Sequence, residues 1–231
     1  QLAKNNHMPA IALTDNNNMF GALEFSIECM NNGIQPIIGS SINFLDIQNK
    51  DTTSQINFLV KNEIGYKNLL YLSSKSHTSD NFPIGIFAKD LENYNEGLIC
   101  YIGGEFNPLL ILKLINKQNL NSNYINFFKN LFKEDFLFEI QRINDPKIDD
   151  FENEFFELSD KYNISFIGTN NVKFKNKEDY NAHDALLCIA QKTTINQTNR
   201  LSSNPEIYFK SSDEMKNIFA DIPIVIENNY S

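Results

Sequence analysis

The stretch that decides the fold lies near the start of the chain and reads Ala10-Ile11-Ala12-Leu13-Thr14-Asp15-Asn16-Asn17-Asn18-Met19-Phe20-Gly21. Its apolar beginning predicts a short buried strand, its polar middle a loop, and its end the opening of a helix. In α/β proteins the loops at the carboxyl ends of strands carry the chemistry. This loop holds one carboxylate, Asp15, followed by three asparagines. An amide oxygen is a poorer ligand for a transition metal than carboxylate or imidazole, so the loop has the position of a site but little of its chemistry.

The composition indicates a folded, acidic chain. It has 231 residues, 42% of them hydrophobic, with 19 Phe, which is enough for a sizeable core. Twenty Lys and Arg against 29 Asp and Glu give a net charge of −9, which argues against nucleic-acid binding by this chain alone. The three cysteines are far apart in sequence, which favours buried free thiols in a reducing cytoplasm.

Three further sequence features bear on location and on the ends of the chain. No apolar run approaches the roughly 18 residues of a membrane-spanning helix. We find no signal peptide, and we expect no contact with a membrane. The chain opens inside a helical pattern and does not begin with Met, so we expect the true N-terminus to lie upstream.

Strand and helix patterns alternate along the chain. The predicted strands are 10–14, 36–44, 55–60, 97–102, 136–141 and 165–169. The predicted helices are 20–32, 65–74, 108–116, 121–132, 148–162, 177–191 and, capped by Ser211 or Ser212, the segment to Phe219. Such alternation predicts βαβ units and a largely parallel sheet in one α/β domain, with a C-terminal extension after about Asn196.

Asp15 has two interpretations. At a strand end it could bind a metal or act as a general base. Its side chain could instead cap the following turn and helix. Because no His or carboxylate stands beside it in the sequence, we favour the cap.

Three other segments also allow two interpretations each. After the strand 165–169, an Asp-x-His pair would point two metal ligands to one side, but this chain has Asn171 and Lys173 there. A lysine repels a metal, so Lys173 either replaces the charge of a missing ion or is a solvated loop residue. Asp179 and His183 share a helix face, but a zinc site needs more ligands, so we favour a capping or surface histidine. Gly103-Gly104-Glu105 could approach a phosphate, or form a tight turn into the next helix.

Taken together, the segments resemble one family: the PHP (polymerase and histidinol phosphatase) domain at the N-terminus of bacterial replicative DNA polymerase III alpha subunits. The resembling segments are Met8–Asp15, Met19–Phe25, Gly33–Gly39, Lys61–Leu69, Phe138–Arg142, Ala182–Ile189, Asn199–Leu201 and Tyr208–Ser211. Their order and spacing extend the resemblance from about Leu2 to Asn229.

The resemblance implies a distorted seven-stranded β/α barrel, similar to metal-dependent hydrolases, with metal-binding loops at one end. It places the PHP-like domain at 1–195 and an extension towards the polymerase body at 196–231. The family's N-terminal strand and His-x-His ligands would precede Gln1. Active members resemble trinuclear, usually zinc-containing, phosphoesterases. At the family's ligand positions this chain has Asp15, Asn16, Ser41, Gln55, Asn171 and Lys173, of which only Asp15 keeps its ligand type.

These replacements predict a degenerate PHP domain with no metal, no catalytic residue and no hydrolytic activity of its own. The resemblance implies a scaffold that packs on the polymerase and provides a docking surface for the 3′→5′ proofreading exonuclease subunit. DNA, dNTPs, magnesium and the sliding clamp would be bound by the parent polymerase, not by this chain. The alternatives are a free-standing PHP phosphoesterase and, against the net charge, a nucleic-acid-binding module.

Overall fold

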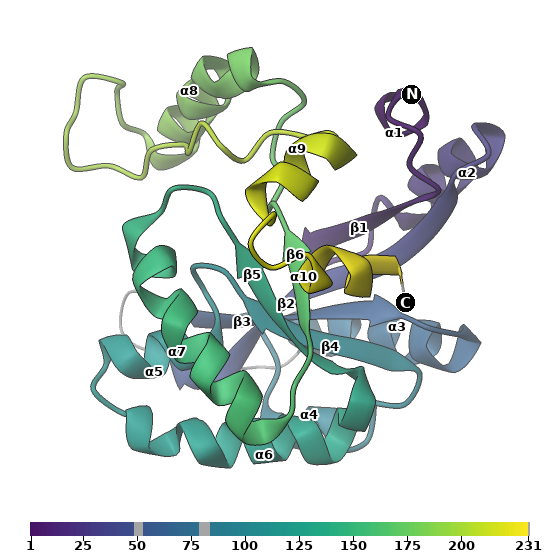
Figure 1. Cartoon of the computed structure of the whole chain (residues 1–231), viewed down its shortest axis with the longest axis vertical. Coiled ribbons are helices and arrows are strands. Elements are labelled where there is room, and N and C mark those ends of the chain that lie inside the picture. Colours follow the sequence, from purple (N-terminus) through teal and green to yellow (C-terminus); the bar gives the residue numbers. More distant parts are fainter. Residues whose placement is uncertain (49–52, 79–83, 231) are drawn as a thin grey trace. The chain divides into compact units, whose positions relative to one another are not determined.

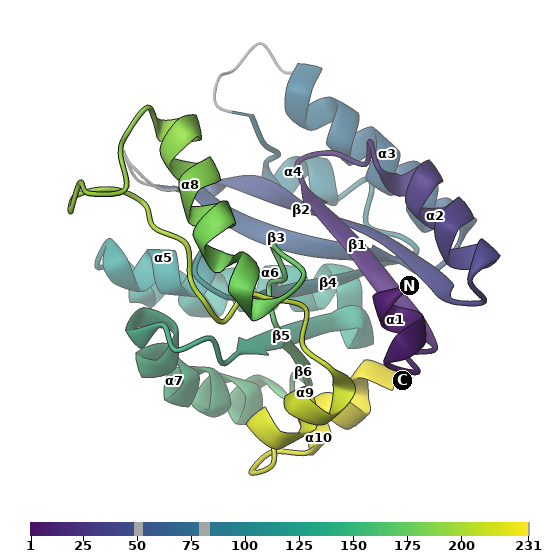
Figure 2. The ribbon, with the colours of Figure 1, turned by 90° about the horizontal axis from the view of Figure 1, so that it is seen from above.

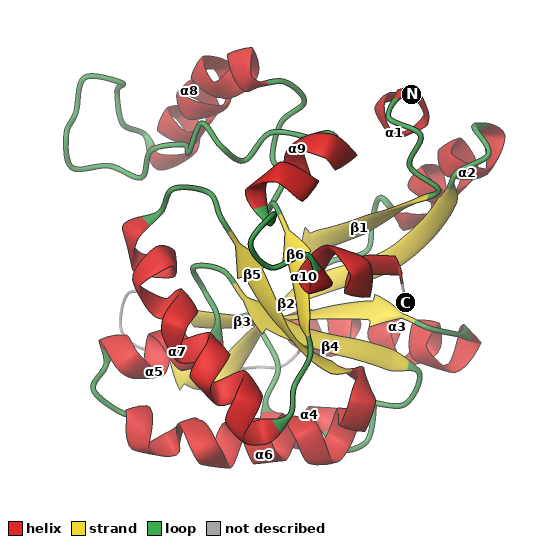
Figure 3. Ribbon diagram, viewed as in Figure 1, coloured by secondary structure: helices red, strands yellow, loops and turns green. Residues whose placement is uncertain are grey.

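The computed structural model describes residues 1–48, 53–78 and 84–230. Its strands are β1 (Ala10–Asn16), β2 (Gln35–Gln48), β3 (Thr53–Val60), β4 (Leu98–Gly103), β5 (Phe136–Gln141) and β6 (Phe166–Thr169). Its α-helices are α1 (Leu2–Asn5), α2 (Ala22–Asn31), α3 (Glu63–Thr78), α4 (Ala88–Leu91), α5 (Pro108–Leu114), α6 (Asn121–Phe132), α7 (Pro146–Tyr162), α8 (Tyr180–Gln191), α9 (Ser212–Ile218) and α10 (Ile224–Glu227). Short 3-10 turns lie at Gln118–Leu120, Lys133–Asp135, Lys177–Asp179 and Asn228–Tyr230. Figure 1 follows these elements along the chain, and Figure 3 separates helices from strands.

The predicted elements are confirmed, but their pairing differs from the prediction. Six strands form one sheet in the order in which they occur in the sequence. β1 pairs with β2, and β4 with β5, in parallel. β3 runs antiparallel to both of its neighbours, so the expected largely parallel sheet is wrong at its centre. For β2 and β3 the reason is local: no helical pattern separates them, and a parallel crossover needs one.

The seventh strand of the expected barrel is not found in the described ranges, whereas the α/β character of the fold is confirmed. By their contacts the residues divide into two compact units, 1–139 with 154–166 and 140–153 with 167–231. The division at residue 195 that the family resemblance implies stays a prediction.

The first unit has an aromatic core on one face of its sheet. Phe128 stacks on Phe136 with ring centroids 5.4 Å apart, and Phe138 meets Phe155 edge-on at 4.8 Å. Alternate residues of a strand face the same side, so Phe136 and Phe138 on β5 both enter this core. Within this unit α2 contacts β1 and β2, α3 and α5 contact β2 and β3, and α6 contacts β4. Figure 2 shows β1, β2 and α2 from above.

The second unit is held by a smaller apolar cluster and an arginine clamp. Ile143, Ile148 and Ile207 are buried together, with Phe174 packed on them. Arg142 donates to both carboxylate oxygens of Glu152, at 3.1 and 2.7 Å, and of Asp221, at 2.5 and 2.8 Å. These two carboxylates raise the pKa of Arg142 further above its usual value. The clamp fixes the loop after α9 against the first turns of α7.

Candidate functional site

The face of the first unit's sheet opposite the aromatic core is polar. Ser41 on β2, Asn57 on β3 and Tyr101 on β4 are register partners across three strands. Asn43 and Gln55, each two residues from Ser41 and Asn57 along its strand, form the next pair on this face. Since side chains two residues apart share a face, β2 and β3 carry this row of hydroxyls and amides on one side of the sheet.

These polar groups are hydrogen-bonded to one another. The Ser41 hydroxyl donates to the Asn57 side-chain oxygen. Gln55 Nε2 donates to Asn43 Oδ1 over 3.1 Å. Ser41 and Gln55, at two of the family's ligand positions, are thus donors to amide oxygens of the same face.

Two buried titratable groups belong to the same unit, and the sequence analysis did not single them out. Tyr101 and Glu139 are both more than nine-tenths buried. Burial raises the pKa of the Tyr101 phenol well above its usual value, and the Glu139 charge raises it further, while a hydrogen bond with Thr14 opposes them. Glu139 is thus one carboxylate near a phenol, where a PHP metal cluster would need several anionic or imidazole ligands.

A sequence signal for Glu139 exists in the pattern of β5. The strand alternates Phe136, Phe138 and Ile140 with Leu137, Glu139 and Gln141. The first set faces the core, so the second set had to face the other side. Tyr101 lacks such a signal because β4 is apolar throughout.

The asparagine loop after β1 is built into the sheet by Asn17, which adopts a left-handed backbone with φ 58°. Its N–H donates to the Ser41 carbonyl at 2.7 Å, and its side-chain oxygen accepts the Asn43 N–H at 2.9 Å. His77 Nε2 donates to the Asn17 carbonyl at 2.7 Å. α3 thus brings His77 to the loop from sixty residues away.

Asp15 and Asn16 lie at the exposed end of β1. Asp15 does not cap the helix, because the residue at the start of α2 is Gly21 and no side chain caps it. No hydrogen bond of the Asp15 carboxylate is found within the described ranges. Asn18 closes the loop on itself, donating to the Asn16 carbonyl at 2.9 Å and accepting from the Phe20 N–H at 3.1 Å. The predicted cap is thus replaced by asparagine contacts.

In the second unit, Asn171 and Lys173 are exposed. Asn171 is left-handed, with φ 40°, and the Lys173 N–H donates to the Ile207 carbonyl at 2.8 Å. The buried lysine of this unit is Lys210, whose ammonium donates to Asn170 Oδ1 at 3.0 Å. Burial lowers the pKa of Lys210. The polar segment after β6 therefore anchors the Tyr208–Ser211 segment through Asn170.

The other two candidates have structural partners. Asp179 accepts the Asn176 N–H at 2.9 Å, and His183 Nδ1 lies 2.6 Å from the Ser203 hydroxyl. After β4 the chain makes a tight turn: Gly104 is left-handed, and its carbonyl accepts from the Asn107 side chain at 2.7 Å. Asn107 then caps α5 by accepting the Leu110 N–H at 2.9 Å.

An ion pair joins two of the segments on which the family resemblance rests. Arg200 donates to both oxygens of Asp184, at 2.8 and 2.7 Å, and the Ser203 N–H donates to the same carboxylate at 2.9 Å. Arg200 and then Ser203 lower the pKa of Asp184 to about 2.

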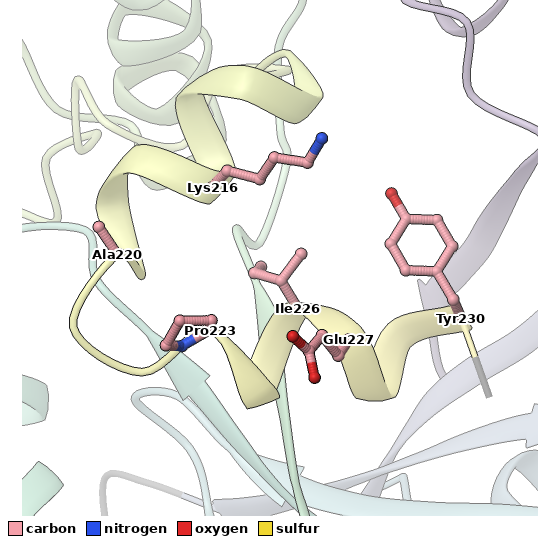
Figure 4. A pocket seen from close by; sticks show the side chains of 6 residues that line it. All are labelled: Lys216, Ala220, Pro223, Ile226, Glu227 and Tyr230. Atoms are coloured by element: carbon pink, nitrogen blue, oxygen red, sulfur yellow. The ribbon is translucent and has the colours of Figure 1, made fainter.

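The candidate site lacks a cluster of metal ligands, and the pocket of the second unit lies away from the predicted site residues. In the described ranges no three His, Cys, Asp or Glu side chains come together as a metal site. An open pocket of about 270 Å³ lies in the second unit, lined by Lys216, Ala220, Pro223, Ile226, Glu227 and Tyr230 (Figure 4). It contains none of the predicted site positions.

In the part of the chain that the structure describes, no helix is long and apolar enough to cross a membrane.

Comparison with known proteins gives consistent relatives. DNA polymerase III subunit alpha of Rickettsia bellii is 37% identical over 99% of this chain and 20% of its own length. The subunit of the same name from Campylobacter jejuni is 36% identical over 95% of this chain and 20% of its own length. The chain spans about a fifth of the length of these curated relatives.

A solved structure is also similar, but weakly. It is that of a proposed metal-dependent phosphoesterase from Bifidobacterium adolescentis, with a TM-score of 0.38 and 11% identity over 95% of this chain and 88% of that one.

The family match covers the strands that carry the polar face. The PHP domain family matches residues 1–143, which include all of β1 to β5. The chain therefore belongs to the PHP domain family.

Proposed function

We propose that this chain is the N-terminal PHP region of a replicative DNA polymerase III alpha subunit and serves there as a scaffold. The observation that carries the proposal is the similarity to such subunits, 36–37% identity along 99% of the chain. The scaffold has no hydrolytic activity, and it provides a docking surface for the proofreading exonuclease. Polymerisation, with its magnesium, DNA, dNTPs and sliding clamp, belongs to the rest of the polymerase, which acts in the cytoplasm.

The chemistry of the polar face supports the loss of hydrolysis. Its serine and amide side chains are neutral and satisfy one another, as the Ser41–Asn57 and Gln55–Asn43 hydrogen bonds show. Several clustered metal charges need anionic ligands to neutralise them, and among the described residues of this face the carboxylate is that of Glu139. The residues present do not fit a trinuclear zinc centre, so no step of the function passes through one.

The test is a hydrolysis assay on the 231-residue chain. Purified protein is incubated with bis-p-nitrophenyl phosphate and added zinc or manganese, beside a Glu139→Gln variant prepared in the same way. We expect no turnover above the metal-only blank in either protein. Turnover in the wild type that Glu139→Gln abolishes would establish a phosphoesterase and overturn the inactive scaffold.

The assignment to a polymerase is tested separately. The intact polypeptide that contains this sequence is purified and assayed for primer extension with magnesium and dNTPs, beside the 231-residue chain. We expect extension by the intact protein and none by the chain. If the intact protein does not extend primers, or if the chain does, the proposed place in a polymerase is wrong.

A further inference from the structure

Helix α2 presents an apolar stripe on its outer face. Leu23, Ile27 and Met30 are 75, 44 and 64% exposed and recur at helical spacing, and Phe20, one turn before, is 89% exposed. The opposite side of the helix is the buried one, with Ala22 and Cys29 against the rest of the unit. The stripe therefore plays no part in the core of its own unit. Figure 2 shows α2 along the outside of β1 and β2.

The charges around this stripe have one sign. Glu24 and Glu28 follow one flank of the stripe, one helical turn apart. From residue 5 to residue 49 the chain has no Lys or Arg, but it has Asp15, Glu24, Glu28 and Asp46. An apolar stripe with an acidic flank favours a partner that combines apolar side chains with positive charge.

The same charges exclude two other occupants. In a symmetric dimer that pairs the two α2 helices antiparallel, the acidic flanks of the two copies would meet at one seam, and like charges repel. The cytoplasmic face of a membrane is itself anionic and would repel Glu24 and Glu28. A protein segment with Lys or Arg beside its apolar side chains has neither problem.

We propose that the outer face of α2 is a docking site for a basic amphipathic helical segment of a partner protein. Phe20 to Met30 spans about 15 Å along the helix, so a partner helix of about 10 residues with apolar side chains at i, i+3 or i+4, and i+7 matches it. A contact of this size is weak on its own. The inference deepens the proposed scaffold function, on which it rests, by naming a docking surface and the chemistry of its partner.

The test uses two synthetic helical peptides as probes, each with leucines at i, i+4 and i+7. One peptide carries lysines beside the leucines and the other carries glutamates at the same positions. Binding to the 231-residue chain is measured by fluorescence anisotropy as a function of salt. We expect saturable binding of the lysine peptide that weakens with salt, and at least about tenfold weaker binding of the glutamate peptide.

Three double variants locate the binding. Leu23→Ser with Met30→Ser removes half of the stripe, and should weaken binding of the lysine peptide at least about tenfold. Glu24→Gln with Glu28→Gln keeps the stripe, and should weaken binding several-fold while flattening its salt dependence. The matched control is Leu186→Ser with Ile189→Ser on α8, where the side chains are 61 and 74% exposed, and it should bind as the wild type does. Circular dichroism checks that all the variants are folded.

Four outcomes would overturn the inference: no saturable binding, equal binding of both peptides, equal loss in the α8 variant, or a dimer of the chain that the α2 variant dissociates. None of these bears on the place in a polymerase, because primer extension by the intact protein is measured independently. Conversely, lysine-peptide binding that maps to α2 would stand even if the intact protein did not extend primers.

Discussion

Gly103 is a residue whose missing side chain the fold requires. A Cβ at this position would lie 2.3 Å from the Glu139 carbonyl oxygen and 2.4 Å from the Glu139 Cβ. Because the first of these atoms is backbone, β4 and β5 would have to separate locally. We expect Gly103→Ala to lower the free energy of unfolding by about 3 kcal/mol, at the upper end of overpacking costs. Urea denaturation followed by circular dichroism measures the loss.

The matched control is Gly21→Ala. A Cβ there meets Leu13 and Asp15 side-chain atoms at 3.5 and 3.6 Å, which is ordinary contact. The expected cost is about 1 kcal/mol or less, because Ala begins a helix less well than Gly. Equal losses in the two variants would show that the approach of Glu139 does not set the requirement at Gly103.

The Asp184–Arg200 pair predicts a dependence of stability on acid. The pKa of Asp184 is lowered to about 2 in the folded protein, against about 3.9 in an unfolded chain. A carboxyl group whose pKa is lowered by folding stabilises the folded state at pH values above the pKa of the unfolded chain. This contribution is lost as the pH falls towards 2. We therefore expect Asp184→Asn to be less stable than the wild type by a constant amount between about pH 5 and 7, and the difference to shrink below about pH 4. Urea midpoints of both proteins over this range measure it, and a difference that stayed constant to pH 3 would contradict the assignment.

At the same scale, residues show where sequence reasoning succeeded and failed. The period-two alternation of β5 could have placed Phe136 and Phe138 in the core and Glu139 on the polar face, but the sequence prediction gave only the strand. No local pattern links His77 to Asn17, because the bond depends on where α3 ends in space. That Asn16, Ser41 and Gln55 are replaced ligands stays a prediction from their positions in the family, whereas the hydrogen bonds that they or their neighbours make came only from the structure.

At the scale of elements, the positions of helices and strands followed from periodicity and from capping residues. Ser211 caps α9 as expected, with Glu214 completing the box. The direction of β3 did not follow, because periodicity gives a strand no direction. The absence of a helical pattern between β2 and β3 was the available sign of an antiparallel pair.

The side chain of Asn107 both caps α5 and holds the turn at Gly104 that precedes this helix. It is buried, accepts the Leu110 N–H at 2.9 Å and donates to the Gly104 carbonyl at 2.7 Å. Asn107→Ala removes the acceptor of the Leu110 N–H in a buried place and leaves the Gly104 carbonyl only the long bond from the backbone N–H of residue 107, at 3.5 Å. We expect it to cost about 2 kcal/mol of unfolding free energy. Thermal and urea unfolding measure the cost.

The comparison for Asn107 is the exposed cap Ser211. Ser211→Ala removes an N-cap acceptor for the Glu214 N–H at 3.2 Å, in contact with solvent. Its expected cost is about 1 kcal/mol, because water replaces the lost bond. If Ser211→Ala cost as much as Asn107→Ala, burial would not be the reason for the greater cost at Asn107.

At the scale of the whole molecule, the family and the chemistry of the site point in different directions. The PHP match extends over β1 to β5, so the framework that presents the polar face is retained. The groups on that face are neutral, apart from Glu139. The aromatic core that packs this framework lies on the other face of the sheet.

This separation of framework and metal predicts how the whole chain responds to metal ions. A metal that binds only the folded state raises the free energy of unfolding by about 2.7 kcal/mol when its free concentration is 100 times its dissociation constant. For a chain of this length that would raise the thermal midpoint by roughly 5–10 °C. Because the face has neutral, mutually bonded side chains, we expect the same midpoint in EDTA, zinc and manganese. Differential scanning calorimetry measures it, and a rise with either metal that EDTA reverses and Glu139→Gln removes would show that the polar face still binds a metal.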